Sequence, residues 1–312
     1  GVWNIVQELG KRRIEKNHEM TKLNKNEMIK GKVETEILYE EADGNWLRLQ
    51  GHDRKKYGSS REMKIMIAYD GVKYHAQKNN TYRKELDNKV AYASFESVKN
   101  FNMHKDAVIA GKFNMDGVVL KVKNGDGAQW IQKDVDCRTI SVLDKFHRNK
   151  KIKECIHNSE MIKTLNLLMN EEKFDEMIEC IEAYINSTED EKEISGANEL
   201  LRYYTENKEV LSSYFERGIT IPPTREPGVI HYARLGSMES NVFTLIGNRM
   251  KGRRACWSIN GGNNLAAILC AKYTSSLDRL FPECDLVNCA EDSKEPLSVA
   301  RCASYEGKGY EF

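Results

Sequence analysis

Three acidic residues, Asp43, Asp126 and Glu239, are candidates for a shared metal site. Asp43 precedes Gly44 at the end of an expected strand, and Asp126 lies between two glycines at the end of another. Functional groups gather at the carboxyl ends of strands in an open sheet, so these two carboxylates meet if their strands are neighbours. Glu239 falls in the first turn of an expected helix, and the preceding Ser237 suits a helix start.

Three carboxylates at one point repel one another unless divalent cations lie between them. Mg²⁺, or Mn²⁺ in its place, takes hard oxygen ligands and keeps positions for water and substrate phosphates. Two such ions activate a nucleophile and stabilise the leaving oxygen in phosphoryl transfer. The three acids therefore predict two-metal chemistry on a phosphodiester. The alternative is that both Asp-Gly pairs are ordinary turns, because this dipeptide is a common turn signal and the chain holds 47 acids.

A second pair of candidates, Asp144 and His147, directly follows an expected strand at residues 139–143 and begins a helix. Residues three apart share a helix face, and the preceding strand should belong to the same sheet as the others. We expect His147 to orient a carboxylate or to contact a phosphate. The alternative is an aspartate that caps the helix and a histidine that faces solvent.

The spacing of apolar residues indicates which elements position these side chains. Alternation of apolar and polar residues predicts strands over residues 33–39, 46–49, 64–69, 117–123 and 139–143. Apolar residues at helical spacing predict helices over residues 2–29, 93–104, 145–217, 238–250 and 263–273. Gly10 ends the apolar run of the first helix. Strands followed by a long helical block and final helices predict an α/β protein.

Composition excludes some classes of protein. The chain has 312 residues, of which 40% are hydrophobic, and its formal net charge is +1. A nucleic-acid partner therefore depends on local basic patches. No apolar run approaches the roughly 20 residues of a membrane span, and the first residues lack the apolar centre of a secretory signal. The eight scattered cysteines fit reduced thiols of a cytoplasmic protein, and Cys284, Cys289 and Cys302 lack the paired spacing of a zinc knuckle.

Two basic clusters are candidates for binding DNA phosphates. The first consists of Lys145, Arg148, Lys150 and Lys151, and the second of Lys251, Arg253 and Arg254. The alternative for each cluster is a charged face that only contacts solvent.

Five motifs in order point to a family. They are EADGNWLRLQ (41–50), NGDGAQWI (124–131), LDKFHRNK (143–150), GSMESNV (236–242) and CWSINGGNNLAAIL (256–269). Together they resemble the bacterial ISLre-type insertion-sequence transposases, relatives of the Mutator-like group with an Asp-Asp-Glu active site. The resemblance implies an RNase H-like mixed sheet flanked by helices, with an all-helical insertion before the last catalytic helix. It assigns Asp43, Asp126 and Glu239 as the catalytic, metal-binding triad, with Asp144 and His147 as an auxiliary element.

The resemblance also implies a division of the chain. Residues 1–30 are expected to be a basic helical remnant of an N-terminal helix-turn-helix that would fix where DNA binds. The first part of the RNase H-like core then spans residues 31–147, the helical insertion residues 148–228, the last core helices residues 229–275 and a tail residues 276–312.

The implied reaction has two displacements on double-stranded DNA. Water first cuts a phosphodiester at the terminal repeat of the element, and the resulting 3′-hydroxyl then attacks target DNA. The resemblance also implies a homo-oligomer when the protein is bound to DNA. Two other functions stay open, namely an RNase H-like nuclease without strand transfer and a domesticated DNA-binding protein without catalysis.

Overall fold

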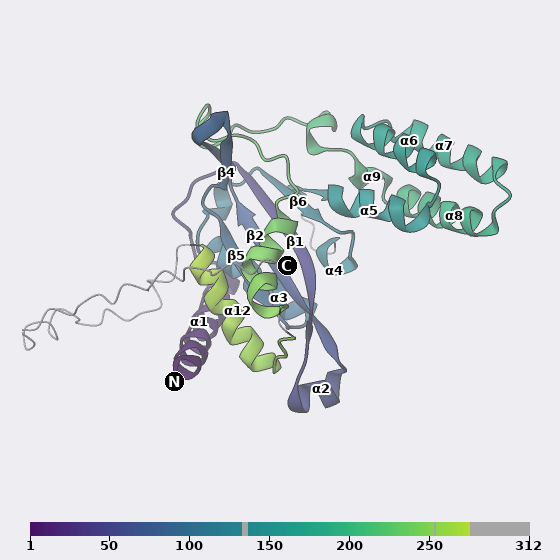
Figure 1. Ribbon diagram of the computed structural model, residues 1–312. Helices are drawn as coiled ribbons and strands as arrows, with labels where there is room; N and C mark the ends of the chain where they lie inside the picture. The colour runs from purple at the N-terminus through teal and green to yellow at the C-terminus, as the bar shows by residue number, and fades with distance from the viewer. Residues whose placement is uncertain (133–136, 253, 275–312) are drawn as a thin grey trace, which may run out of the picture.

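A mixed five-stranded sheet forms the centre of the computed structural model, which describes residues 1–132, 137–252 and 254–274 (Figure 1). The expected tail with its three cysteines lies outside the described residues. Across the sheet, the order is β5-β2-β1-β6-β7. These strands are β1 (Ile37–Arg48), β2 (Ser60–Tyr69), β5 (Val90–Ser94), β6 (Leu120–Gly125) and β7 (Thr139–Leu143), and a separate hairpin consists of β3 (Val72–Ala76) and β4 (Tyr82–Leu86).

The strand directions give the sheet its class. β2 is antiparallel to both β1 and β5, whereas β6 runs parallel to β1 and to β7. The two parallel pairings need crossover connections, which contain the helices between β5 and β6 and between β6 and β7. An antiparallel meander followed by two parallel strands, with helices on both faces, is the RNase H-like arrangement that the motifs led us to expect.

Helices cover both faces of this sheet. On one face, α10 (Met238–Val242), the π-helical turn η4 (Phe243–Gly247) and α11 (Asn248–Met250) form a continuous run that packs with α12 (Ile259–Tyr273). On the other face, α3 (Val98–Ala110) and α4 (Gln129–Gln132) enclose a second apolar cluster. Short helical turns lie in the connections, namely α2 (Gly51–Tyr57), η1 (Lys78–Asn80) and η2 (Met115–Gly117).

The first helix, α1 (Val2–Lys25), packs against α12 and α3. The helix does not end at Gly10, where its apolar run ends. This glycine is buried where α1 contacts α12. A Cβ at Gly10 would lie only 2.3 Å from the backbone oxygen of Asn264. Gly10 therefore allows two helices to approach closely. No helix in the described ranges, α1 included, is both long enough and apolar enough to cross a membrane.

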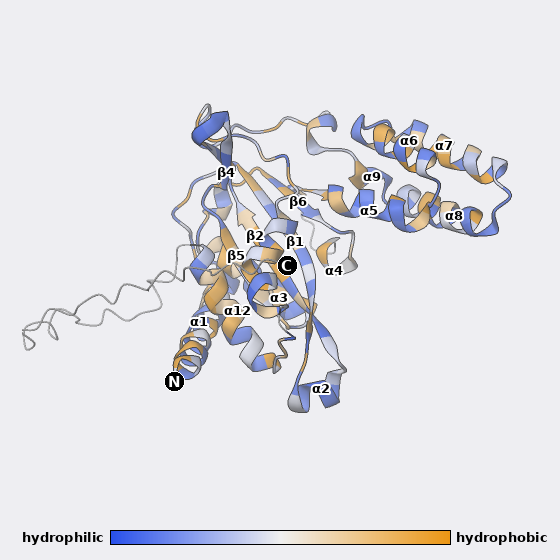
Figure 2. Ribbon diagram, viewed as in Figure 1, coloured by the Kyte–Doolittle hydropathy of each residue, from blue (hydrophilic) through white to orange (hydrophobic). Residues whose placement is uncertain are grey.

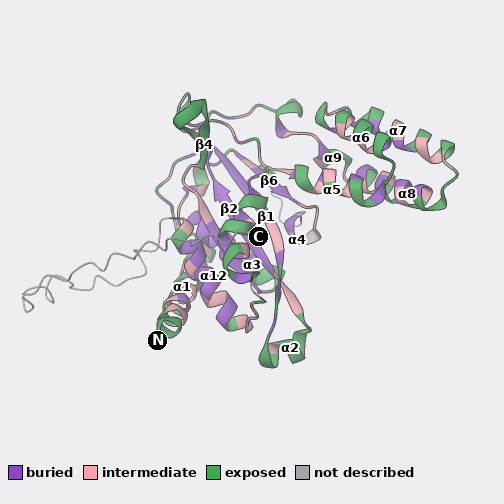
Figure 3. Cartoon of the chain, viewed as in Figure 1, coloured by how far each residue is buried: buried purple, intermediate pink, exposed green. Residues whose placement is uncertain are grey.

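The long helical block has an apolar core of its own. Its elements are α5 (Lys145–Cys155), α6 (Ser159–Asn170), α7 (Phe174–Ser187), α8 (Glu191–Glu206), α9 (Lys208–Leu211) and η3 (Tyr214–Glu216). The block projects to one side of the sheet (Figure 1). Apolar and polar residues alternate along its helices (Figure 2), and the polar faces are the exposed ones (Figure 3).

Two local expectations from the sequence were wrong. Asp43-Gly44 is not a turn, because β1 runs unbroken through both residues and pairs with β2 over this whole segment. Asp43 thus lies within a strand instead of at its end. The helix expected from Ala93 begins only at Val98, since Ala93 belongs to β5 and Ser97 caps the helix.

Candidate active site

Asp43 and Asp126 lie on neighbouring parallel strands. β1 pairs with β6 in a register that sets Glu41 level with Asn124. Two residues further along, Asp43 is level with Asp126, the residue that directly follows β6. Side chains two residues apart in a strand point to the same face of a sheet, so Asp43 faces the side that carries Glu41 and Asn124, and Asp126 lies in the bend directly after β6.

Backbone N–H groups hold one oxygen of each aspartate. Oδ1 of Asp43 accepts a hydrogen bond from Gly44 N at 2.7 Å, and Oδ1 of Asp126 accepts one from Ala128 N at 2.8 Å. Gly127, between Asp126 and Ala128, has φ +88°, a left-handed conformation that strongly favours glycine. The tight turn directs an N–H group at the Asp126 carboxylate. The other oxygen of each aspartate suits coordination of a cation.

The imidazole of His147 lies beside these carboxylates. Its Nε2 is 3.9 Å from Asp43 Oδ2. The contact with Asp43 raises the pKa of His147, and the negative charges of Asp144 and Asp126 add to this effect against the opposing effect of burial. Asp144 also caps α5 by accepting hydrogen bonds from Phe146 N at 2.9 Å and His147 N at 3.3 Å. The charges of three carboxylates therefore act on this one imidazole, although among the described residues no three of these four side chains have ligand atoms that all lie within 4.8 Å of one another.

A fully buried carboxylate, Glu41, lies next to this site. It accepts hydrogen bonds from Tyr69 Oη at 2.6 Å, Asn124 Nδ2 at 2.9 Å and Ser237 N at 3.0 Å. Asn124 Nδ2 also donates to Asp144 Oδ2 at 2.9 Å. Burial raises the pKa of Glu41 although the hydrogen bonds lower it. The network joins β1, β2, β6, α5 and the start of α10, so it fixes the elements that carry the candidate residues.

Glu239 lies in the first turn of α10, on the face of the sheet that carries Asp43. The start of this helical run binds Glu41, and a Cβ at Gly247, near its end, would lie 3.7 Å from Asn45 Nδ2. The run therefore passes along the side of β1 that includes Asp43. Glu239 is exposed, and in the part of the chain that the structure describes, the three predicted ligands do not have oxygens that all lie within 4.8 Å of one another. Asp43 lies in β1, Asp126 directly follows the neighbouring strand β6, and Glu239 is on the adjacent helix.

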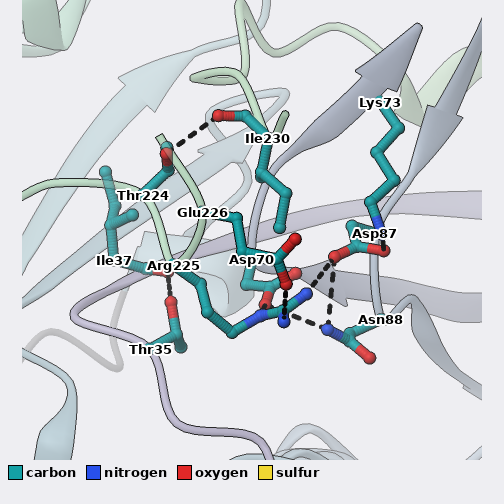
Figure 4. Close-up of polar contacts among 10 residues, drawn as sticks. All are labelled: Thr35, Ile37, Asp70, Lys73, Asp87, Asn88, Thr224, Arg225, Glu226 and Ile230. Atoms are coloured by element: carbon teal, nitrogen blue, oxygen red, sulfur yellow. Dashed lines mark hydrogen bonds and ion pairs between the residues drawn. The ribbon is translucent and has the colours of Figure 1, made fainter. Parts of the chain in front are cut away.

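An ion-pair network links the sheet to the connector, which is the segment between η3 and α10 (Figure 4). Arg225 donates from Nε to Asp70 Oδ2 at 3.2 Å and from Nη2 to Asp87 Oδ2 at 2.6 Å. Asn88 Nδ2 donates to Asp70 at 3.0 Å, and Lys73 Nζ donates to Asp87 at 2.8 Å. Since Asp70 directly follows β2 and Lys73 lies in β3, this network sets the position at which the connector leaves the sheet.

Glu62 of β2 explains the glycine that follows Asp43. A Cβ at Gly44 would lie 2.1 Å from Glu62 Oε1, so any larger residue here would displace the Glu62 side chain. Burial raises the pKa of Glu62, Lys64 lowers it, and the negative charges of Asp126 and Asp43 raise it further. Gly44 therefore serves packing between strands instead of a turn.

Two residues near the site escaped the sequence analysis. Glu41 had a signal, because Glu40 and Glu41 are adjacent in an apolar strand and must face opposite sides of the sheet. In a central strand, both need buried partners. Tyr203 of α8 had no such signal. Burial raises the pKa of Tyr203 to about 12, and the charge of Asp126 contributes to the rise, so the helical insertion reaches the carboxylates.

The predicted DNA-binding residues differ in exposure. The prediction for Arg148 was wrong, because its guanidinium is buried, donates to the carbonyl of Leu211 and lies over the ring of Phe174. It is thus part of the insertion core and cannot reach a phosphate. Lys145, Lys150, Lys251 and Arg254 are exposed, Lys151 pairs with Glu199, and Arg253 lies outside the described residues.

A basic groove of about 580 Å³ lies beside α10. Its basic residues are Arg83, Lys84, Lys89 and Lys112. Lys84 Nζ donates to Ser237 Oγ at 2.7 Å, and Lys89 Nζ donates to Asn241 Oδ1 at 3.1 Å. Burial lowers the pKa of both lysines. Ser237 and Asn241 belong to α10 and its N-cap, so the groove runs along the helix that carries Glu239, although Glu239 is not among the residues that line it.

The sheet order, the paired aspartates and the covering helices define an α/β protein of RNase H-like architecture. The chain belongs to the family described as Uncharacterised protein family (UPF0236), whose model matches residues 3–280. The match spans both the sheet and the helical insertion. No curated protein matches the chain.

Proposed function

We propose that this chain is a DNA transposase of an insertion sequence, of the ISLre-type, Mutator-related group that its motifs resemble. The observation that carries the proposal is the placement of Asp43 and Asp126 on neighbouring strands of an RNase H-like sheet, with His147 in contact with Asp43 and under the charge of Asp126. Glu239 is exposed on the helix along this face, so bound DNA and metal can draw it toward the two aspartates.

The donor set fits divalent cations that prefer oxygen ligands. Asp43 and Asp126 each offer an oxygen beyond the one that a backbone N–H holds, and Glu239 adds a third carboxylate. Mg²⁺ or Mn²⁺, as two ions, matches this chemistry. When bound, such ions activate the attacking hydroxyl and stabilise the leaving oxygen of a phosphodiester.

His147 supports the two aspartates electrostatically. Its raised pKa favours the protonated imidazole, whose positive charge offsets repulsion between Asp43 and Asp126. Beside a DNA strand, the same N–H group can donate a charge-assisted hydrogen bond to a phosphate oxygen. Asp144 accepts a hydrogen bond from the backbone N–H of His147 and so fixes the start of the helix that carries this ring.

The basic groove supplies a path for the DNA backbone. At α10, Lys84 and Lys89 donate hydrogen bonds to the neutral side chains of Ser237 and Asn241, which a phosphate can replace. Cations that neutralise phosphates provide most sequence-independent affinity for DNA. In our proposal, double-stranded DNA enters along the groove and reaches the carboxylates, with a homo-oligomer holding two element ends.

The first test is Asp126→Asn in a plasmid-nicking assay with Mg²⁺. We expect nicking to fall by roughly a hundredfold or more, while salt-sensitive DNA binding stays unchanged. The matched control is Asp116→Asn, whose side chain is 80% exposed and which precedes β6, whereas Asp126 follows that strand. Wild-type nicking by Asp126→Asn would remove the proposed role of the aspartates.

The same variant separates the other two functions. A nuclease without strand transfer would cut, but would give no joined product from duplexes with 3′-hydroxyl ends and a plasmid target. A DNA-binding protein without catalysis would give neither product, and Asp126→Asn would change nothing. Joined product from the wild-type chain, lost in Asp126→Asn, supports the transposase.

The groove has its own test, Lys84→Ala. Loss of one phosphate contact should weaken DNA binding for all sequences alike and reduce the slope of affinity against salt by about one. Lys99→Ala, an exposed lysine on α3, is the control. Equal salt slopes for the two variants would exclude the groove as a DNA path.

A further inference from the structure

A second group of ligating side chains lies away from the carboxylates, where α1 meets α3. It consists of His18 on α1, Glu96 after β5 and His104 on α3. Each offers one ligand atom, and these atoms all lie within 4.8 Å of one another. His104 Nδ1 is 2.9 Å from Glu96 Oε2, and His18 Nε2 is 3.9 Å from Oε1. The two imidazole rings stack with centroids 4.5 Å apart.

The carboxylate of this group is held by further hydrogen bonds. Tyr92 Oη donates to Glu96 Oε2 at 2.8 Å, and Ser94 Oγ donates to the same oxygen at 3.1 Å. Burial raises the pKa of Glu96, but the hydrogen bonds from His104, Tyr92 and Ser94 outweigh it and lower the pKa overall. The glutamate is therefore ionised and oriented, as metal-ligating carboxylates are when neighbouring groups support them.

We propose that His18, Glu96 and His104 bind one Zn²⁺ ion. Two imidazole nitrogens and one carboxylate are a known zinc donor set that leaves a fourth position for water. The imidazole nitrogens disfavour Mg²⁺, which prefers oxygen ligands. His18 is 46% exposed, so the ion has a path from solvent.

The ion would join three elements. α1 otherwise meets the rest of the protein through contacts such as Gln7, which receives a hydrogen bond from Asn264 at 2.9 Å. A zinc ion between His18 and the ligands on α3 and the β5–α3 loop would clamp α1 to the edge of the sheet. This site is independent of the phosphoryl-transfer proposal, because it shares no ligand with it.

The test is calorimetric titration of metal-free protein with Zn²⁺, in the presence of excess Mg²⁺. We expect His18→Ala and Glu96→Gln each to remove one equivalent of bound zinc, or to weaken it by roughly a hundredfold. His52→Ala, an exposed histidine on α2, and Asp126→Asn should keep that equivalent. These two controls separate this site from zinc bound elsewhere and from the carboxylate site.

Two further readouts do not depend on stoichiometry. Saturating Zn²⁺ should raise the Tm of the wild-type chain by roughly 5 °C, and this shift should vanish in His18→Ala. Co²⁺ in place of zinc should give visible d–d absorption that the same variant loses. Full zinc stoichiometry and an unchanged shift in both His18→Ala and Glu96→Gln, with folding verified by circular dichroism, would overturn the site.

Discussion

Replacing Arg225 by methionine tests whether charge holds the connector in front of α10. Methionine keeps an unbranched apolar stem but removes the ion pairs of Arg225 with Asp70, Asp87 and Glu226 (Figure 4). Asp70 is fully buried. In the variant it keeps the hydrogen bond from Asn88 but loses its countercharge. Asp87 keeps Lys73 and is affected less. The loss of folding stability therefore arises mainly from the buried carboxylate of Asp70.

The magnitude follows from burial. Removing one partner of a buried ion pair costs about 3–5 kcal/mol. The side chain of Arg225 is 29% exposed and that of Asp87 is 13% exposed, so solvent already screens part of the interaction. We expect a loss of about 2–3 kcal/mol in the free energy of unfolding. For a chain of this size, that loss lowers Tm by roughly 4–6 °C.

Urea unfolding followed by far-UV circular dichroism measures this loss. Arg234→Met, at an exposed arginine of the same connector, is the matched control and should cost about 0.5 kcal/mol or less. Asp70→Asn added to Arg225→Met should recover part of the loss, because a neutral amide needs no countercharge. Equal losses in Arg225→Met and Arg234→Met would refute the reasoning.

A pH series supplies an independent check. Burial raises the pKa of Asp70, and removal of Arg225 raises it further. For a carboxyl group with a raised folded-state pKa, stability is present below the unfolded value and is lost as pH rises through the folded value. The deficit of Arg225→Met should therefore be larger at neutral pH than near about pH 4. A deficit that does not change with pH would assign the loss to packing.

Three further predictions concern other buried contacts. The pKa of His147 is raised, so its stabilising effect is present below about pH 6.5 and is lost as pH rises through the folded value. The stability difference between wild type and His147→Gln in urea should shrink between about pH 6 and pH 9, and a constant difference would contradict this. Glu40→Gln removes a carboxylate that Lys105 contacts at 2.9 Å and Lys121 at 2.5 Å. Urea unfolding should show a loss of about 3 kcal/mol in the free energy of unfolding. The exposed Asp116→Asn is the control, and its loss should be negligible. Gly10→Ala forces a Cβ against the backbone of α12 and should lower stability by about 1–3 kcal/mol, and an unchanged Tm would mean that α1 does not pack there.

Local patterns in the sequence predicted much of the fold. The strand expected at residues 139–143 has those bounds, and the helix expected at residues 238–250 spans that run, with a π-helical turn inside it. Asp144 begins α5 because its side chain caps the first turn, which is a short-range interaction that the sequence displays. Such features depend on neighbours along the chain, so they are visible without a structure.

Features that depend on distant residues were not visible. Asp43-Gly44 has the composition of a turn, but pairing with β2 keeps it extended, and Glu62 supplies the reason for the glycine. Arg148 has the composition of a basic surface, but Leu211 and Phe174, from later helices, bury it. The basic groove combines the β3–β4 hairpin with α10, residues that lie about 150 positions apart in the sequence.

The position of Glu239 follows from contacts at both ends of the insertion. At its start, Asp144 caps α5 and receives a hydrogen bond from Asn124, which also donates to Glu41. At its end, Arg217 donates to the carbonyl of Ser141 at 2.7 Å, and the connector then runs to α10. Glu41 binds the first turn of α10, so the insertion and the helix that carries Glu239 share one buried network. The exposed lysines of α5 therefore lie on an element that is hydrogen-bonded, through the side chains of Asn124 and Glu41, to the helix that carries Glu239.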